Sequence, residues 1–262
     1  MTNPLYPAFF RLDRLEMLVV GAGQVGEEKL SFILKSSPNA RVTIVAPWMG
    51  EDLRLLLDAY ERDTVALDGG GAQVERSAAK PDGIWHTPAG GIVSWYRREF
   101  QPADVKEVDL VVAATNFKDV NYAVWEAAKA ERRLTNVADT PSLCDFYLGS
   151  IVTRGPLKVA ISTNGQSPTF AKRFRQWLEA ELPELETTDL IEHLHDFRDR
   201  LTGDFQTKVR ELNTLTSGLL SSASPGRSCP PGGCLLAAAA KPNDASPAPD
   251  ATPTDGQQEN LN

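Results

Sequence analysis

The sequence predicts an α/β fold, in which helices cover both faces of a parallel sheet. Short apolar runs alternate with segments of helical spacing, which is the order found in βαβ units. The first apolar run ends in a glycine-rich turn, as strand-to-helix turns of such folds often do. The hydrophobic fraction of 42% and the charged fraction of 24% are typical of a globular protein. The 262 residues allow one large domain or two modest ones.

The first part of the chain supplies the predicted elements of this sheet. Apolar and β-branched runs predict strands at 16–20, 42–45, 92–95 and 109–114. Helical spacing predicts helices at 27–35, 51–60 and 120–131, and Leu30, Ile33 and Leu34 share one face of the first. The stretch 67–91 is rich in Gly, Pro and Ala and has little periodicity, so we interpret it as an inserted surface loop.

The second part of the chain has a different character. Two strand-like runs at 150–153 and 157–162 flank Arg154-Gly155-Pro156, which predicts a hairpin. Ser167 and Pro168 predict a helix start, and this helix is expected to end at Leu182, before Pro183. A second helix is predicted at 188–212. Residues 218–262 lack aromatic residues and are dominated by Pro, Ser, Ala and Gly, which predicts a disordered tail.

Composition and charge exclude several classes of protein. No apolar run approaches the roughly 20 residues that cross a bilayer, so we expect no membrane partner. The N-terminus shows no secretory signal, and 3 cysteines are too few for a disulfide scaffold, which together predict a cytoplasmic protein. The net charge of −8 argues against a nucleic-acid partner. It is compatible with an anionic small ligand held in a local basic pocket.

The residues 21–26 form a G-x-G-x-x-G pattern between a predicted strand and a predicted helix. In this pattern Gly21 permits the tight turn, Gly23 lets the backbone approach a pyrophosphate, and Gly26 lets the helix pack on the strand. The helix N-terminus then offers free N–H groups to the phosphates. The context favours a dinucleotide site over the alternative, a glycine-rich turn without a ligand.

The end of the second predicted strand lacks the residue that usually identifies the dinucleotide. NAD-binding folds often place Asp or Glu there, to hold the ribose 2′-OH. Here the chain reads Val45-Ala46-Pro47-Trp48, with neither an acid nor an arginine for a 2′-phosphate. The adenosine ribose is expected to be held by backbone groups around Pro47 and Trp48. Chemistry alone leaves NAD and NADP both open.

A second group of polar residues, Asn136-Val137-Ala138-Asp139, follows the strand-like run 133–135. Late strands of an open α/β sheet end at the ligand crevice, so Asp139 is placed to meet a substrate beside a bound nicotinamide. On residue type alone, the favoured alternative is a turn-forming aspartate before Thr140 and Pro141.

Motifs over about residues 5–183 resemble one enzyme family. In chain order they are Tyr6-Pro7-Ala8-Phe9-Phe10-Arg11-Leu12, the loop 21–26 with Lys29, Val45-Ala46-Pro47, Ala113-Ala114-Thr115-Asn116 with Asn121, Asn136-Val137-Ala138-Asp139, Leu143-Cys144-Asp145-Phe146, Arg154-Gly155-Pro156-Leu157, and 160–168 with Ala171 and Arg175. Together they resemble the precorrin-2 dehydrogenase / sirohydrochlorin ferrochelatase family, the N-terminal module of siroheme synthase. Gly26, Glu28, Gly149-Ser150 and Asn164 depart from the residues frequent in that family, and none of these changes removes a reactive group.

The resemblance implies a domain organisation and a quaternary structure. It implies a Rossmann domain at 1–117 that binds NAD, with 67–91 as its insertion. A segment at 118–165 would form an intertwined homodimer, and a helical domain would follow at 166–217, before the tail at 218–262. The tail is too short to supply the methyltransferase domain of some siroheme synthases, so precorrin-2 is expected from a separate enzyme.

The resemblance also implies the reaction and its residues. Precorrin-2 would be oxidised to sirohydrochlorin with NAD, and Fe²⁺ would then be inserted to give siroheme. Asp139 matches the aspartate implicated in both steps, as proton acceptor and as transient metal contact. The expected cofactor contacts are Gly21, Gly23, Gln24, Val25, Gly26, Pro47, Trp48 and Thr115.

The tetrapyrrole substrate carries eight carboxylates and is expected to meet cations and hydroxyls. Arg154, Lys158, Lys172, Arg173 and Arg175 are the candidate cations, because guanidinium and ammonium groups pair with carboxylates. The other predicted substrate contacts are Asn136, Ser162, Thr163 and Ser167. The pair His193 and His195 and the pair Cys229 and Cys234 are weak metal signals, and we interpret them as solvated histidines and a linker.

Two alternatives remain open at this stage. The protein could be a dehydrogenase without chelatase activity, which the sequence hardly separates from the bifunctional enzyme. It could also be a non-catalytic Rossmann domain that senses NAD, although 136–139 and 160–168 would then have no role.

Overall fold

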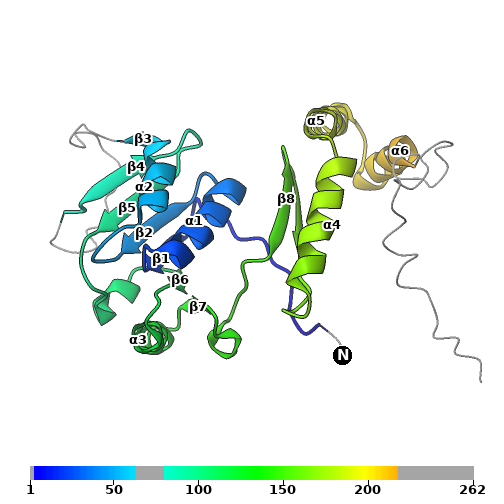
Figure 1. The fold of residues 1–262 in the computed structure, drawn as a ribbon. Helices are drawn as coiled ribbons and strands as arrows, with labels where there is room; N and C mark the ends of the chain where they lie inside the picture. The colour runs from blue at the N-terminus through cyan, green and yellow to red at the C-terminus, as the bar shows by residue number, and fades with distance from the viewer. Residues whose placement is uncertain (1–2, 63–79, 218–262) are drawn as a thin grey trace, which may run out of the picture. The chain divides into compact units, whose positions relative to one another are not determined.

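The computed structural model describes residues 3–62 and 80–217 (Figure 1). The described chain divides into two units, with the boundary between Phe197 and Arg198. Within the described residues, no helix is long and apolar enough to cross a membrane. The predicted tail at 218–262, with Cys229 and Cys234, lies outside the described residues.

The centre of the first unit is a seven-stranded sheet with the order β3-β4-β5-β2-β1-β6-β7. The strands β1, β2, β5, β6 and β7 are parallel, and β3 and β4 add an antiparallel edge. Their bounds are β1 Glu16–Val20, β2 Arg41–Val45, β3 Glu61–Arg62, β4 Gly83–His86, β5 Ile92–Tyr96, β6 Leu110–Ala113 and β7 Leu134–Val137. The predicted α/β fold class is confirmed.

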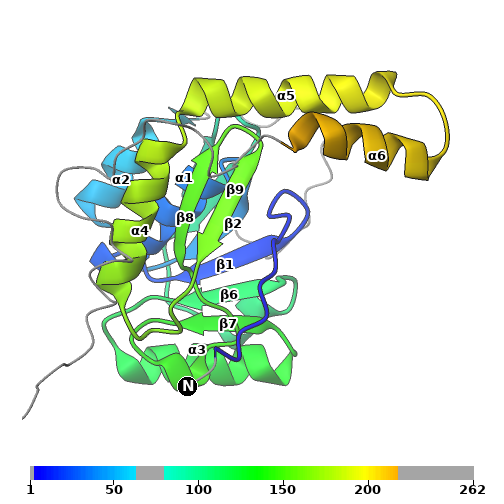
Figure 2. The same cartoon turned by 90° about the vertical axis from the view of Figure 1, so that its right-hand side faces the viewer.

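Helices cover both faces of this sheet, so its central strands are buried on both sides. α1 (Gln24–Ser36) and α2 (Glu51–Asp58) pack on one face, against alternate residues of β1 such as Met17 and Val19. α3 (Lys118–Ala130) and the 3₁₀ turn η1 (Pro102–Val105) pack on the other, against Leu18 and Val20. Figure 2 shows β1, β6 and β7 side by side above α3.

The structure departs from the sequence interpretation at the edge of the sheet. Gly83–His86, expected to lie in a surface loop, is strand β4 and pairs antiparallel with β5. Its four residues carry no alternating pattern, and long-range pairing with β5 defines the strand. The remainder of the predicted insertion, at 63–79, lies outside the described residues.

The sheet also extends past the domain boundary expected at residue 117. α3 and β7 follow that boundary, and β7 completes the sheet because Leu134 to Val137 pair in register with Leu110 to Ala113 of β6. The dinucleotide-binding fold therefore includes β7, and the dimerisation role expected for 118–165 stays a prediction.

After the sheet, the chain forms the short 3₁₀ turn η2 (Pro141–Leu143) and then a hairpin. β8 (Ser150–Arg154) and β9 (Leu157–Ile161) pair antiparallel as predicted, and Gly155 takes the positive φ of +53° that the turn requires. α4 (Pro168–Glu181) starts as predicted, because the Ser167 hydroxyl accepts a hydrogen bond from the Phe170 N–H at 3.3 Å.

The single helix predicted at 188–212 is two helices. α5 spans Glu184–Arg200 and α6 spans Phe205–Thr216. Gly203 interrupts the helical backbone with a φ of +104°, and the Asp204 carboxylate then caps α6 by accepting from the Thr207 N–H at 2.8 Å. A glycine followed by a capping aspartate indicates that one helix ends and another begins. The apolar periodicity continues across these two residues, and it hid this signal in the sequence.

Candidate dinucleotide and substrate site

The glycine-rich turn lies where the strand order reverses, which is where open α/β sheets bind their ligands. β2 and β6 lie on opposite sides of β1, and the turn follows β1 directly. Gly21 has a φ of +105°, and a Cβ there would lie 2.5 Å from the Ala114 carbonyl oxygen. A Cβ on Gly26 would lie 2.3 Å from the Gly21 oxygen. Both positions therefore need glycine, as the sequence predicted.

The first turn of α1 has the properties of an anion site. Gly23 is the N-cap residue, and no side chain caps the helix within the described part of the chain. The N–H groups of Gln24, Val25 and Gly26 have no acceptor among the described residues, whereas the Glu27 N–H donates to the Gly23 carbonyl. Free N–H groups and the positive end of the helix dipole suit a pyrophosphate, so an NAD(P) molecule fits this turn.

The loop that follows β2 lies beside the glycine-rich turn. The Gly21 N–H donates to the Val45 carbonyl at 3.0 Å, and the Gly50 N–H donates to the Ala22 carbonyl at 2.8 Å. A Cβ on Gly23 would lie 3.2 Å from the Trp48 ring, whose side chain is 57% exposed. The structure thus brings Gly23 and Trp48 together, as expected for two contacts of one cofactor, and Pro47 is exposed next to them.

The loop after β6 forms the other side of the turn. The Thr115 N–H and hydroxyl both donate to Asn121 Oδ1, at 3.1 and 2.7 Å, and Asn121 Nδ2 donates to the Thr115 carbonyl at 2.9 Å. Asn121 is a buried residue of α3, and these hydrogen bonds hold the loop after β6 in place. The sequence motif contained Asn121, but no role followed from the motif alone.

Asp139 lies at the same edge of the sheet as the glycine-rich turn. The strands β1, β6 and β7 end in register, at Val20, Ala113 and Val137. Asp139 therefore follows β7, which lies two strand spacings, or about 10 Å, from β1. Asp139 is exposed and has a φ of +55°. Its carboxylate makes no hydrogen bond or ion pair with any residue that the structure describes. A turn-capping aspartate would use its carboxylate locally, so the geometry favours the functional interpretation.

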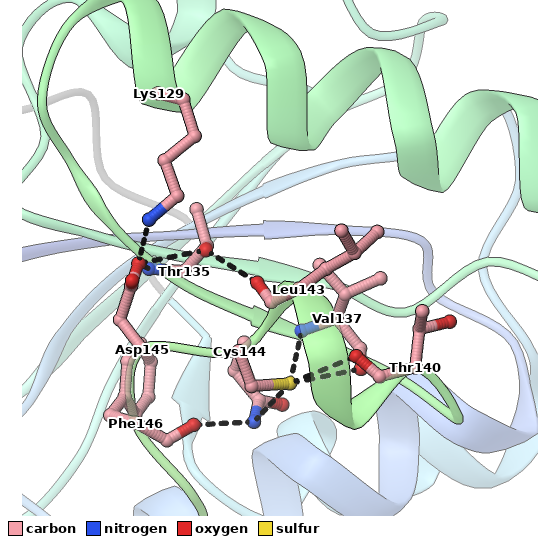
Figure 3. A network of polar contacts seen from close by, with 9 residues as sticks. Lys129, Thr135, Val137, Thr140, Leu143, Cys144, Asp145 and Phe146 are labelled. Carbon is pink, nitrogen blue, oxygen red and sulfur yellow. Dashed lines mark hydrogen bonds and ion pairs between the residues drawn. The ribbon is translucent and has the colours of Figure 1, made fainter.

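A network of polar contacts fixes the course of the chain after β7 (Figure 3). Asp145 accepts hydrogen bonds from the Thr135 N–H at 2.9 Å and the Thr135 hydroxyl at 3.0 Å, and forms an ion pair with Lys129 of α3. Burial acts to raise the pKa of Asp145, but the bonds from Lys129 and Thr135 outweigh it and lower that pKa. The network ties residue 145 to the start of β7 and so holds the intervening loop.

Asn136 and Cys144 also hold the loop that follows β7. Asn136 is 6% exposed, and its Nδ2 donates to the Phe146 carbonyl at 2.8 Å, while its buried Oδ1 has no partner among the described residues. The Cys144 sulfur accepts from the Val137 N–H at 3.2 Å, and burial raises the pKa of its thiol. Asn136 is therefore enclosed and braces the loop after β7, and its contact with substrate stays a prediction.

Three of the five candidate cations are engaged inside the protein. Arg154 caps the C-terminal end of α4 by donating to the carbonyls of Leu182 at 2.6 Å and Glu179 at 2.7 Å. Arg175 forms an ion pair with the Glu179 carboxylate at 2.5 Å. Lys158 donates to the Ser36 carbonyl at the end of α1, and burial lowers its pKa.

These contacts give Arg154 and Arg175 structural roles, and their contact with substrate stays a prediction. Carbonyls at a helix end and a carboxylate one turn away satisfy their guanidinium groups. Lys172 and Arg173 are exposed and have no partner among the described residues, so they are the candidate cations that are open to a polyanion.

The predicted hydroxyl anchors shape the loop before α4. Ser162 Oγ accepts from the Asn164 N–H at 3.2 Å, and Thr163 Oγ1 accepts from the Ser167 N–H at 3.2 Å. Their contact with substrate stays a prediction. No group of three His, Cys, Asp or Glu side chains suited to a metal occurs in the described ranges, which include His193 and His195.

Two family models match the chain. Residues 8–150 match a model described as putative NAD(P)-binding, and residues 154–181 match the central part of a sirohaem biosynthesis protein. Siroheme synthase 1 of Aeromonas salmonicida is 33% identical over 178 residues, which are 68% of this chain and 31% of that protein. Siroheme synthase of Mannheimia succiniciproducens is 30% identical, over 80% of this chain and 36% of that protein. The chain spans about a third of the length of these relatives.

A solved structure shares the fold. SirC, a precorrin-2 dehydrogenase, superposes with a TM-score of 0.55 at 22% identity, over 80% of this chain and 89% of that chain.

Proposed function

This chain belongs to the putative NAD(P)-binding family of siroheme biosynthesis proteins, and from that premise we propose that it oxidises precorrin-2 to sirohydrochlorin with NAD. The single observation that carries the proposal is the unpaired, exposed carboxylate of Asp139. Asp139 follows β7, which lies two strands from β1 in the sheet. The glycine-rich turn follows β1 at the same edge. A dehydrogenase needs a proton acceptor and a dinucleotide site close together, and this edge supplies both.

The oxidation removes a hydride and a proton from the substrate. When bound, NAD supplies the hydride acceptor, the nicotinamide ring. Asp139 accepts the proton at its carboxylate, which is free to do so because no other residue of the described chain engages it. A positioned general base of this kind contributes roughly 10²–10⁴-fold to the rate.

The chain holds the cofactor mainly through its backbone. The N–H groups of Gln24, Val25 and Gly26 bind the pyrophosphate, and Gly23 lets it approach. Pro47 and Trp48, in the loop after β2, would hold the adenosine part of the cofactor. Thr115, held by Asn121, borders the site after β6.

The substrate carboxylates are bound by cations and hydroxyls that precede or lie in α4. Lys172 and Arg173 are exposed and unpaired within the described residues, and Ser162, Thr163 and Ser167 keep hydroxyl hydrogens that can donate. These side chains follow the hairpin within the segment that matches the sirohaem central model.

A chelation step follows oxidation in this proposal. Fe²⁺ is its substrate, and the macrocycle releases two N–H protons as the metal enters. Asp139 accepts one of these protons and contacts the metal transiently, and water takes the other proton. A dehydrogenase without chelation remains the alternative, because the oxidation alone also needs Asp139.

The protein is proposed to act as a cytoplasmic homodimer. Within the described residues, β8 and β9 form a two-stranded sheet with no further strand on either edge, and an open strand edge is a template for pairing with another chain. Light scattering of the purified protein tests this proposal. A mass of one chain at working concentration would contradict it.

The decisive experiment mixes the full-length protein with NAD and precorrin-2 under anaerobic conditions and follows NADH absorbance. A precorrin-2 dehydrogenase forms NADH, whereas a non-catalytic NAD sensor forms none. Adding Fe²⁺ or Co²⁺ to purified sirohydrochlorin with the protein then tests chelation separately. Metal insertion no faster than in protein-free buffer would leave only the dehydrogenase.

A further inference from the structure

We propose that Phe117 binds the tetrapyrrole substrate: its exposed ring is the apolar surface on which the macrocycle lies, between the glycine-rich turn and Asp139. The inference rests on the proposed function, since it concerns the substrate of the same site. It deepens that function by adding a residue that contacts the face of the macrocycle, whereas the cations and hydroxyls named above contact its carboxylates.

The position of Phe117 in the sheet places it on the substrate side of the cofactor. Phe117 follows β6, which lies between β1 and β7 (Figure 2). The three strands end in register, so the loop after β6 stands between the glycine-rich turn and the loop that carries Asp139. A dinucleotide crosses such an edge with its adenosine on the β2 side and its pyrophosphate at the turn after β1. Its nicotinamide therefore reaches the β6 side, where the substrate has to meet it.

The side chain of Phe117 serves neither the helix start nor the core. Phe117 is the N-cap residue of α3, a position that favours Ser, Thr, Asp or Asn because their side chains accept from a free N–H of the first turn. A phenyl ring makes no such bond. The ring is 69% exposed and belongs to neither hydrophobic cluster of the described residues. It is therefore open to a ligand at this edge.

The backbone that carries this ring is held from both sides. The Phe117 N–H donates to Thr115 Oγ1 at 3.1 Å, and the Phe117 carbonyl accepts from the Asn121 N–H at 3.0 Å. Thr115 lies against the glycine-rich turn, since a Cβ on Gly21 would lie 3.1 Å from Thr115 Cγ2. A ring on a fixed backbone loses little conformational entropy when a ligand binds to it.

The chemistry of the substrate suits an aromatic ring at this place. The tetrapyrrole has a broad, largely apolar face, and its carboxylates lie on its rim. Cations and hydroxyls bind the rim but leave the face of the macrocycle in water. A phenyl ring covers such a face in an offset stack and removes apolar surface from water.

The test titrates sirohydrochlorin, the product of the proposed oxidation, into the full-length protein and follows its absorbance. Phe117→Ala is expected to raise the dissociation constant of sirohydrochlorin about tenfold, as loss of one stacked ring does, and to leave that of NADH unchanged. Phe117→Tyr keeps the ring and should bind sirohydrochlorin as the wild type does. Phe32→Ala is the matched control: it removes a 48% exposed ring from the second half of α1 and should change neither constant.

A second variant separates the loss of binding from damage to the fold. Phe117→Asp also removes the ring, but it installs a preferred capping residue at the start of α3. It should therefore raise the melting temperature and still weaken sirohydrochlorin as much as Phe117→Ala. In the oxidation of precorrin-2, both variants should raise KM about tenfold at unchanged kcat, because a stacked ring binds the substrate and the transition state alike.

The outcomes distinguish the inference from the proposed function. Unchanged sirohydrochlorin binding in folded Phe117→Ala or Phe117→Asp would overturn the inference and leave the proposed function intact. A variant that weakens NADH in place of sirohydrochlorin would also overturn it, because the ring would then serve the cofactor. A wild-type protein that binds NADH but neither binds sirohydrochlorin nor oxidises precorrin-2 would overturn the proposed function, and the inference with it.

Discussion

Replacing Asp139 with asparagine removes one proton acceptor and changes little else. The carboxylate makes no hydrogen bond or ion pair with the described residues, so its loss leaves no partner unsatisfied. Asparagine also adopts the left-handed backbone, here with a φ of +55°, about as easily as aspartate. The fold and the binding of NAD should therefore be unchanged in Asp139→Asn.

The expected catalytic loss follows from the role of the carboxylate. Removing a positioned general base lowers turnover by roughly 10²–10⁴-fold, equal to about 2.7–5.4 kcal/mol in the barrier. Asp139→Ala should lose the same factor in turnover. It should also lose about 1 kcal/mol of stability, because alanine is strained at a positive φ. That cost lowers the melting temperature by about 2–4 °C in a protein of this size.

The assay combines three measurements on each variant: the rate of NADH formation from precorrin-2, the dissociation constant of NAD, and the melting temperature. Chelation of Fe²⁺ should fall in both variants if the two reactions share Asp139. A folded Asp139→Asn protein that binds NAD and turns over at a near-normal rate would refute the proposed base.

Further predictions concern the glycine turn and the supporting contacts. Gly23→Val should abolish NAD binding and oxidation, because the valine side chain would press on the Trp48 ring and on the pyrophosphate. Chelation should survive. Calorimetry measures the NAD binding, and metallation of sirohydrochlorin measures the chelation. Asp145→Asn should cost about 1–2 kcal/mol in urea unfolding at neutral pH. The folded-state pKa of Asp145 is lowered, so the wild type should keep its whole advantage in unfolding free energy above about pH 4. This advantage should disappear as the pH falls through the folded-state pKa. An advantage that does not depend on pH would contradict the charge-based account. Arg154→Ala should lower stability by about 1–3 kcal/mol and leave the KM for precorrin-2 unchanged, since Arg154 bonds to carbonyls. A raised KM at unchanged stability would restore its predicted contact with the substrate.

The sequence by itself determined the parts that depend on neighbours along the chain. The apolar runs of β1, β2, β5 and β6 and the hairpin of β8 and β9 follow from local patterns of residues. So does the start of α4, where Ser167 caps the helix within three residues. Gly21 and Gly26 of the turn were also interpretable from sequence, because each meets a steric limit set by the backbone around the turn.

Tertiary structure alone decided the parts whose partners are distant in sequence. β4 became a strand only by pairing with β5, and β7 joined the sheet only by pairing with β6. Arg154 and Lys158 look like free cations in sequence, yet their acceptors are 28 and 122 residues away. A charged side chain in a sequence has no defined partner, because the unfolded chain leaves it in water. Folding assigns the partner, and with it the difference between Arg154, which holds a helix end, and Asp139, whose carboxylate is left open to a substrate.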